Sequence, residues 1–159
     1  MKHSSYVWRI LVLALSFVVF SQFIPRMHGQ AETGNRTPII VTRLQLTHQT
    51  GAINDMPLFT PTADGLYRVS AYAEMTTLGT DGEICGYLNW VDGAGTQRAD
   101  LIKNLNGTGP CLFVYQPSSA TADTVISGKA GHPVAFEMGV FPPLSGSPEY
   151  SLLITVEQL

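Results

Sequence analysis

The chain has 159 residues, of which 13% are charged and 45% hydrophobic, and a formal net charge of −3 at pH 7. Its nine lysines and arginines are scattered, which excludes the clustered basic surfaces that bind nucleic acid or anionic membranes. The length corresponds to a single domain that is large enough to bury a core without depending on disulfides.

Residues 1–31 have the pattern of a secretory signal peptide. A basic stretch precedes an apolar run at residues 10–20, and small residues follow at Gly29 and Ala31. A signal peptidase recognises this order of regions, so we predict cleavage between Ala31 and Glu32. The alternative is an uncleaved anchor helix, which would keep a structural surface protein at the membrane.

Cleavage would leave a processed chain of 128 residues with a net charge of −6, because the signal contains three basic and no acidic residues. Residues 32–38 are polar and lack periodicity, so we expect a flexible leader there, followed by one domain over residues 39–159. We expect the processed protein to be secreted, in a periplasmic or extracellular location, and to bind neither nucleic acid nor membrane.

Both cysteines, Cys85 and Cys111, lie in the processed chain. An exported protein meets an oxidising compartment, so we predict one disulfide between them, with two buried thiols as the alternative. The sequence has no CxxC motif, and neither His48 nor His132 has another ligand at metal-binding spacing. We therefore predict no metal ion and no other cofactor.

Hydrophobic periodicity predicts strands throughout residues 39–159. Residues 67–75 alternate between apolar and polar side chains almost one by one, which is typical of a half-buried strand. Asp-Gly and Asn-Gly pairs, which suit tight turns, lie between several candidates. We therefore predict an all-β fold, an antiparallel, jelly-roll-like β-sandwich of about eight strands. The candidates are residues 39–49, 56–59, 67–75, 84–91, 97–105, 111–115, 121–127, 134–140 and 150–156.

Local patterns also predict the positions of individual residues in these strands. In the first candidate, Ile40, Leu44 and Leu46 are expected to share one apolar face. The pair Asp81-Gly82 is expected to form a turn between two strands. In a later strand, the alternation predicts that Phe136 points inward.

Several strands also carry apolar side chains on the face that should meet water. A two-sheet sandwich needs only one buried face per strand, and a second apolar face is often an interface. We therefore predict a face for assembly with other chains, although loop cover or a register slip at a bulge would also explain the pattern. The residues of this face are Tyr72, Tyr87, Val91, Phe113, Tyr115, Phe141 and Leu153.

Three segments resemble the jelly-roll head domains of the complement and tumour-necrosis-factor-like proteins. They are LFTPTADGLYRVSAYAEM at residues 58–75, GKAGHPVAFEMGVF at 128–141 and the closing YSLLITVEQL at 150–159. The resemblance covers most of residues 56–159 and implies a compact homotrimer. No collagen-like Gly-x-y stalk precedes the domain, and His132-Pro133 departs from the usual entry to the strand.

We predict that the protein is a secreted, non-catalytic binding or assembly module, with a protein or carbohydrate ligand and no catalytic residues. The alternative is a carbohydrate-active or other hydrolytic β-sandwich enzyme, in which Glu74 and Glu137 would supply the paired carboxylates of glycoside hydrolysis. In that enzyme Tyr87 and Trp90 could form a platform for sugar rings. The alternation places Trp90 on the inward face, however, where packing in the core is the simpler interpretation.

Overall fold

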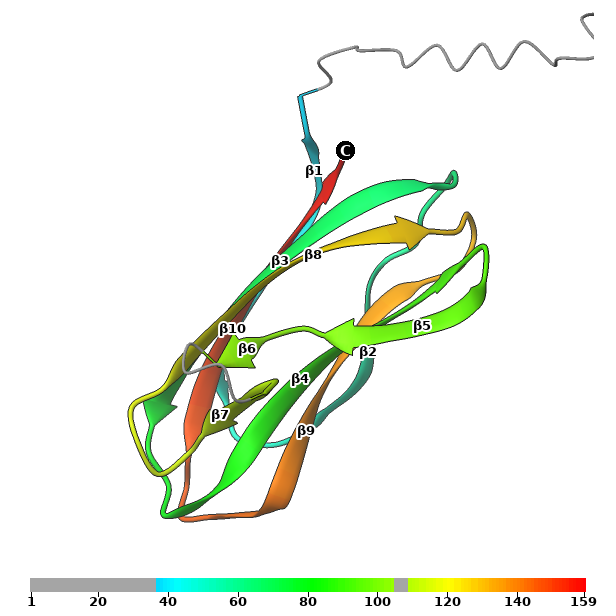
Figure 1. Ribbon diagram of the computed structural model, residues 1–159. Coiled ribbons are helices and arrows are strands. Elements are labelled where there is room, and N and C mark those ends of the chain that lie inside the picture. Colours follow the sequence, from blue (N-terminus) through cyan, green and yellow to red (C-terminus); the bar gives the residue numbers. More distant parts are fainter. Residues whose placement is uncertain (1–36, 105–108) are drawn as a thin grey trace, which may run out of the picture. The chain divides into compact units, whose positions relative to one another are not determined.

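The computed structural model describes residues 37–104 and 109–159. The regular secondary structure of these residues consists of β-strands alone (Figure 1). The strands are β1 (Ile39–Gln49), β2 (Ile53–Phe59), β3 (Gly65–Thr77), β4 (Asp81–Asp92), β5 (Gly95–Asp100), β6 (Lys103–Asn104), β7 (Cys111–Phe113), β8 (Ser119–Gly128), β9 (Val134–Ser145) and β10 (Glu149–Gln158). The described part of the chain has no helix that could span a bilayer.

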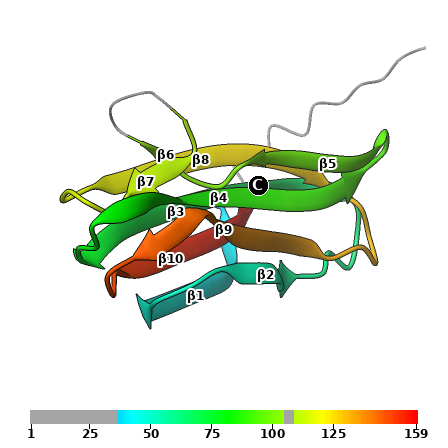
Figure 2. The same ribbon diagram turned by 90° about the horizontal axis from the view of Figure 1, so that it is seen from below.

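The strands form two antiparallel sheets that lie face to face (Figure 2). Sheet A has the order β1-β10-β3-β8-β6, and sheet B has the order β2-β9-β4-β5 with β7 beside β4. Neighbours come from distant parts of the chain, since β1 pairs with β10, β2 with β9 and β3 with β8. This nested pairing is the jelly-roll pattern. The predicted antiparallel, jelly-roll-like sandwich is therefore confirmed.

Alternation along the strands decides which side chains fill the space between the sheets. In β3, Tyr67, Val69, Ala71 and Ala73 are buried, whereas the intervening side chains are half-buried or exposed. The same period of two is seen throughout β10, and in β9 the side chains of Val134, Phe136 and Met138 are buried in the phase that the sequence predicts. The largest fully buried side chains are Tyr150, Phe136, Ile84, Leu88, Leu101, Ile102, Leu112, Ile126, Met138, Leu152, Ile154 and Val69.

The chain crosses between the sheets on one side of the sandwich. After β5 it leaves sheet B, pairs with β8 of sheet A at β6, and returns to sheet B at β7. Leu101 and Ile102 are buried in this crossing. A Cβ at Gly86 would lie 3.1 Å from Ile102 Cγ1, so the glycine makes room for the crossing chain. The single strand predicted over residues 97–105 is therefore wrong, because β5 ends at Asp100 and β6 begins at Lys103.

Two local expectations are wrong, and a β-bulge explains each. The register of β1 and β10 shifts between Ile40 and Thr42, which turns Ile40 away from the core and leaves it 60% exposed. The pair Asp81-Gly82 does not lie between strands, because β4 begins at Asp81. Gly82 has a φ of 111° and lies where the register of β4 and β9 shifts, so this glycine serves a bulge.

Tyr150 is the basis of a prediction about alkaline stability. Its side chain is fully buried, its hydroxyl donates a hydrogen bond of 2.9 Å to the Gly51 carbonyl oxygen, and burial raises the pKa of the phenol to about 12. In the unfolded chain the phenol ionises near pH 10, so the folded state holds this proton more tightly. The contribution of Tyr150 to stability is present below pH 10 and is lost as the pH rises from 10 to 12.

We expect the free energy of unfolding to fall by roughly 2–3 kcal/mol over this pH range through Tyr150 alone. Urea denaturation of the wild type and of Tyr150→Phe at several pH values measures this, because other tyrosines and lysines titrate equally in both proteins. The difference in free energy of unfolding between the wild type and Tyr150→Phe should become smaller as the pH rises. A difference that stays constant from pH 9 to 12 would contradict the prediction.

Candidate functional site

The outer face of sheet B carries a surface of aromatic side chains around a disulfide. We call it the sheet B surface and define it by Glu83, the Cys85–Cys111 disulfide, Tyr87, Phe113, Tyr115 and Phe141. It is centred on the first half of β4, which lies between β9 on one side and β7 on the other. Every second residue of β4 points outward here, because the residues between them, such as Ile84 and Leu88, fill the core.

Aromatic rings flank Glu83 from both neighbouring strands. Phe141 of β9 and Phe113 of β7 are its direct register partners. The rings of Phe113 and Tyr115 lie 5.5 Å apart between centroids, and Tyr115 is 50% exposed. Residues directly opposite in a sheet have neighbouring side chains, so the carboxylate has an aromatic group on either side.

Gly139 allows the ring of Phe141 to lie along the sheet. A Cβ at this glycine would lie only 2.6 Å from Phe141 Cε2, which shows that the ring extends over the glycine backbone. Gly139 is in turn the register partner of Cys85. The ring therefore lies beside the disulfide, yet Phe141 remains 53% exposed.

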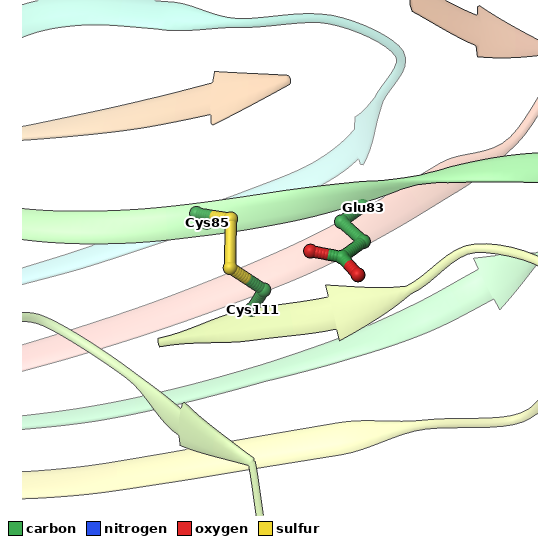
Figure 3. A group of neighbouring side chains, drawn as sticks. All are labelled: Glu83, Cys85 and Cys111. Atoms are coloured by element: carbon green, nitrogen blue, oxygen red, sulfur yellow. A yellow bond between two sulfur atoms is a disulfide. The ribbon is translucent and has the colours of Figure 1, made fainter. Parts of the chain in front are cut away.

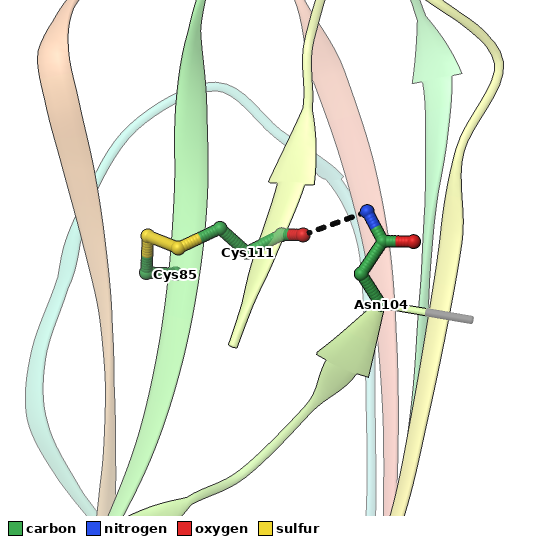
Figure 4. The surroundings of a disulfide bond; sticks show 3 residues. All are labelled: Cys85, Asn104 and Cys111. Carbon is green, nitrogen blue, oxygen red and sulfur yellow. Dashed lines mark hydrogen bonds between the residues drawn. A yellow bond between two sulfur atoms is a disulfide. The ribbon is translucent and has the colours of Figure 1, made fainter. Parts of the chain in front are cut away.

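The predicted disulfide is confirmed. Cys85 and Cys111 are direct register partners with a Cα–Cα distance of 4.0 Å, so the bond joins the short strand β7 to β4. Asn104, which is buried, donates a hydrogen bond of 3.3 Å from Nδ2 to the Cys111 carbonyl oxygen (Figure 4). These contacts hold β7, and with it Phe113, against the sheet.

The Glu83 carboxylate points toward the disulfide, and its oxygen and the two sulfur atoms lie within 4.8 Å of one another (Figure 3). Such a cluster could suggest a metal centre. The two sulfur atoms are bonded to each other, however, whereas zinc and similar ions bind free thiolates. This arrangement is therefore not a cation site for a soft metal while the disulfide is intact.

A second group on the same face of sheet B combines an aromatic ring, a carboxylate and a cation. Arg98 of β5 lies with its guanidinium carbon 4.0 Å from the ring centroid of Tyr87, and its NH2 group donates a hydrogen bond to Glu137 Oε1. Glu137 is the register partner of Tyr87. The three side chains thus satisfy one another across three strands.

The structure divides the predicted assembly face between the two sheets. Four residues of the predicted face lie on strands of sheet B and point to its outer side, namely Tyr87, Val91, Phe113 and Phe141. Tyr115 follows shortly after β7 and lies beside Phe113. Tyr72 and Leu153 are register partners on the outer side of sheet A. Strand periodicity indicates whether a side chain points inward, but it does not indicate to which sheet the strand belongs.

Tyr72 lies between two shallow depressions of about 280 and 330 Å³ on sheet A. Its hydroxyl donates a hydrogen bond of 2.7 Å to Glu74 Oε2. This hydrogen bond is the main cause that raises the pKa of Tyr72, and burial and the charge of Glu74 act in the same direction. Tyr72 is therefore a neutral hydrogen-bond donor at physiological pH.

Four further exposed apolar residues on the outer side of sheet A were absent from the predicted face. They are Ile40, Leu66, Val125 and Leu159. Three of them lie on neighbouring strands around Arg68, and Leu159 directly follows β10. Arg68 is paired with Glu157 at 3.5 Å and with Asp123 at 3.7 Å. The sequence contains a signal for two of them. Leu66 and Val125 are each adjacent to a residue that is buried, Tyr67 and Ile126, so the alternation of a strand places them on its outer side.

The paired carboxylates of the enzyme alternative do not meet. Glu74 lies on β3 of sheet A and points to its outer side, next to Tyr72. Glu137 lies on β9 of sheet B, on the opposite outer side, and is bound to Arg98. The sandwich core separates the two groups, so the interpretation of these residues as a glycosidase pair is wrong.

The remaining candidates take structural positions. Trp90 packs against the core whereas Tyr87 points outward, so the two do not form a sugar platform. His48 Nδ1 lies 2.8 Å from Glu149 Oε2 in an exposed pair. The predicted cleavage site between Ala31 and Glu32 lies outside the described residues.

No protein-family model and no curated protein matches the sequence. Among solved structures, the chain is similar to the Eiger tumour-necrosis-factor protein of S. frugiperda, with 14% identity and a TM-score of 0.42. The match covers 78% of this chain and 94% of that protein. The assignment of the fold depends on the strand order described above.

Proposed function

We propose that the protein is a secreted, non-catalytic module that assembles with copies of itself and binds a partner, which is a protein or a carbohydrate. The observation that carries this proposal is the presence of exposed apolar side chains on the outer sides of both sheets, away from the core. Contiguous exposed apolar residues on a soluble domain typically mark interaction surfaces. The disulfide is compatible with an oxidising, extracellular location.

Sheet A supplies the surface for self-assembly in this proposal. Its outer side carries six apolar residues, of which Leu159 directly follows β10 and the other five lie on four neighbouring strands. These five are Ile40, Leu66, Tyr72, Val125 and Leu153. The Arg68 ion pairs lie among them, and arginine is enriched in interfaces. The sequence resemblance to jelly-roll head domains favours a homotrimer.

Size-exclusion chromatography with light scattering on residues 32–159 tests the assembly. We expect an oligomer for the wild type and a monomer for the double variant Leu66→Ser/Val125→Ser, because the exchange removes two exposed apolar groups from the assembly surface. The matched control is Tyr115→Ser/Phe141→Ser, which removes two apolar groups of similar exposure from sheet B and should leave the oligomer intact.

A wild-type protein that remains monomeric at high concentration would refute self-assembly. An oligomer that the sheet B control dissociates, and the sheet A variant does not, would assign assembly to the other face. Secretion is tested separately by N-terminal sequencing of the exported protein, which should begin at Glu32. A chain that retains residues 1–31 would favour the membrane-anchored alternative.

A further inference from the structure

Around Glu83, the sheet B surface offers a carboxylate and the rings of Phe113 and Phe141, but no cation within residues 37–104 and 109–159 is paired with this carboxylate. Among the described residues, no lysine, arginine or histidine forms an ion pair with Glu83. The side chain is half-buried between Phe113 and Phe141, its register partners. A carboxylate that is partly removed from water gains from a paired cation more than an exposed carboxylate does.

The neighbouring group on the same sheet shows what such a site holds when it is complete. At Tyr87, a carboxylate from β9 and an aromatic ring from β4 together hold the guanidinium of Arg98. At Glu83 a carboxylate and an aromatic ring again lie opposite each other, but the strands that supply them are exchanged. Here β4 supplies the carboxylate and β9 supplies the ring of Phe141. In the part of the chain that the structure describes, the guanidinium is the component that the group around Glu83 lacks.

We propose that Glu83, Phe113 and Phe141 form a site for an arginine side chain of a partner protein. The guanidinium plane would stack on the rings, and its N–H groups would donate hydrogen bonds to the carboxylate. This deepens the proposed function, because it assigns a chemistry to the partner that the module binds. The disulfide and the bond from Asn104 contribute by holding β7, and thus Phe113, in place.

Charge and chemistry favour this occupant over others. The processed chain carries a net charge of −6, which attracts a basic partner over longer distances. Phosphate groups would be repelled by Glu83, and the disulfide leaves no thiolate for a soft metal ion. Arginine is favoured over lysine because its planar, weakly hydrated group stacks on aromatic faces and binds a carboxylate through two N–H groups.

The test is a titration of ¹⁵N-labelled residues 32–159 with an acetylated, amidated Gly-Arg-Gly-Arg-Gly peptide, followed by NMR chemical shifts. The controls are the same peptide with citrulline, which has the shape of arginine without its charge, and with lysine. We expect saturable shifts around Glu83, Phe113 and Phe141 with the arginine peptide, and affinity that falls as salt is added. The citrulline peptide should bind at least about tenfold more weakly, since it lacks the charge-assisted hydrogen bonds.

Variants connect the binding to the proposed residues. Glu83→Gln is expected to weaken the arginine peptide about tenfold, and Phe141→Ala about threefold to fivefold. Both side chains lie on the surface, so the spectra should show an intact fold. The matched control is Glu74→Gln, which removes a carboxylate beside an aromatic ring on the opposite sheet and should leave the affinity unchanged.

Equal binding of the citrulline peptide, an unchanged affinity in Glu83→Gln, shifts confined to sheet A, or no saturable shifts would each overturn the proposal. Equal binding of the lysine peptide would overturn the assignment to arginine. The oligomeric state is measured on the same samples by light scattering. Failure to bind the peptide with an intact oligomer would refute this site alone and leave self-assembly standing.

Discussion

A Cys85→Ala/Cys111→Ala double variant is expected to lose about 3–4 kcal/mol of stability. The disulfide closes a loop with a sequence separation of 26 residues, and opening that loop restores conformational freedom to the unfolded chain. Alanine is chosen because Cys85 is buried, and a serine hydroxyl there would add a separate cost of burying a polar group. For a domain of this size the loss corresponds to a lower melting temperature by about 10 °C.

Urea denaturation of the oxidised wild type, the reduced wild type and the double variant measures the effect. The reduced wild type and the double variant should have similar midpoints, both well below that of the oxidised protein. A midpoint shared by all three proteins would show that the loop is already restricted in the unfolded state, which would contradict the prediction. Because β7 has only three residues, we also expect faster amide exchange at Phe113 without the bond.

Phe136→Ala is expected to destabilise the protein by about 3–5 kcal/mol, whereas Phe141→Ala should change stability by less than about 1 kcal/mol. Both residues lie on β9. Phe136 is completely buried between the sheets, and its truncation leaves a cavity in a closely packed core. Phe141 is 53% exposed on the outer side of sheet B, where water can replace the lost ring.

Thermal and urea denaturation of the two variants provide the comparison. The pair is matched, because residue type, strand and substitution are the same and only the direction of the side chain differs. Equal losses of stability would mean that β9 does not present alternate residues to the core and to solvent. The small effect expected for Phe141→Ala also makes that variant suitable for separating peptide binding from folding.

The sequence predicted the fold well wherever a strand keeps a regular period of two. Phe136 and Tyr67 are buried as their phase requires, and Trp90 lies on the inward side. The failures have local physical causes. An extra residue in β1 turned Ile40 outward, and Leu101 and Ile102 enter the core where the chain crosses between sheets. A bulge or a crossing depends on partner strands that are distant in sequence, so a local pattern does not reveal it.

The candidate site was less accessible to sequence reasoning. The predicted set included Tyr87, Phe113 and Phe141, but it omitted Glu83, the residue on which the proposed arginine site depends. Glu83 directly follows the Asp81-Gly82 pair, and nothing in the local sequence distinguishes it, because its position beside two aromatic residues comes from the register of three strands. The disulfide was predictable from composition and compartment alone.

The pairing of β1 with β10 determines when the domain can be completed. A ribosome makes the chain from the amino end, so β1 has no neighbour in its own sheet until the last ten-residue strand has been made. The same strand is also the link between β1 and β3. A nascent chain that stops before residue 149 therefore lacks the strand between β1 and β3, and sheet A can acquire its native strand order only after β10 has been translated.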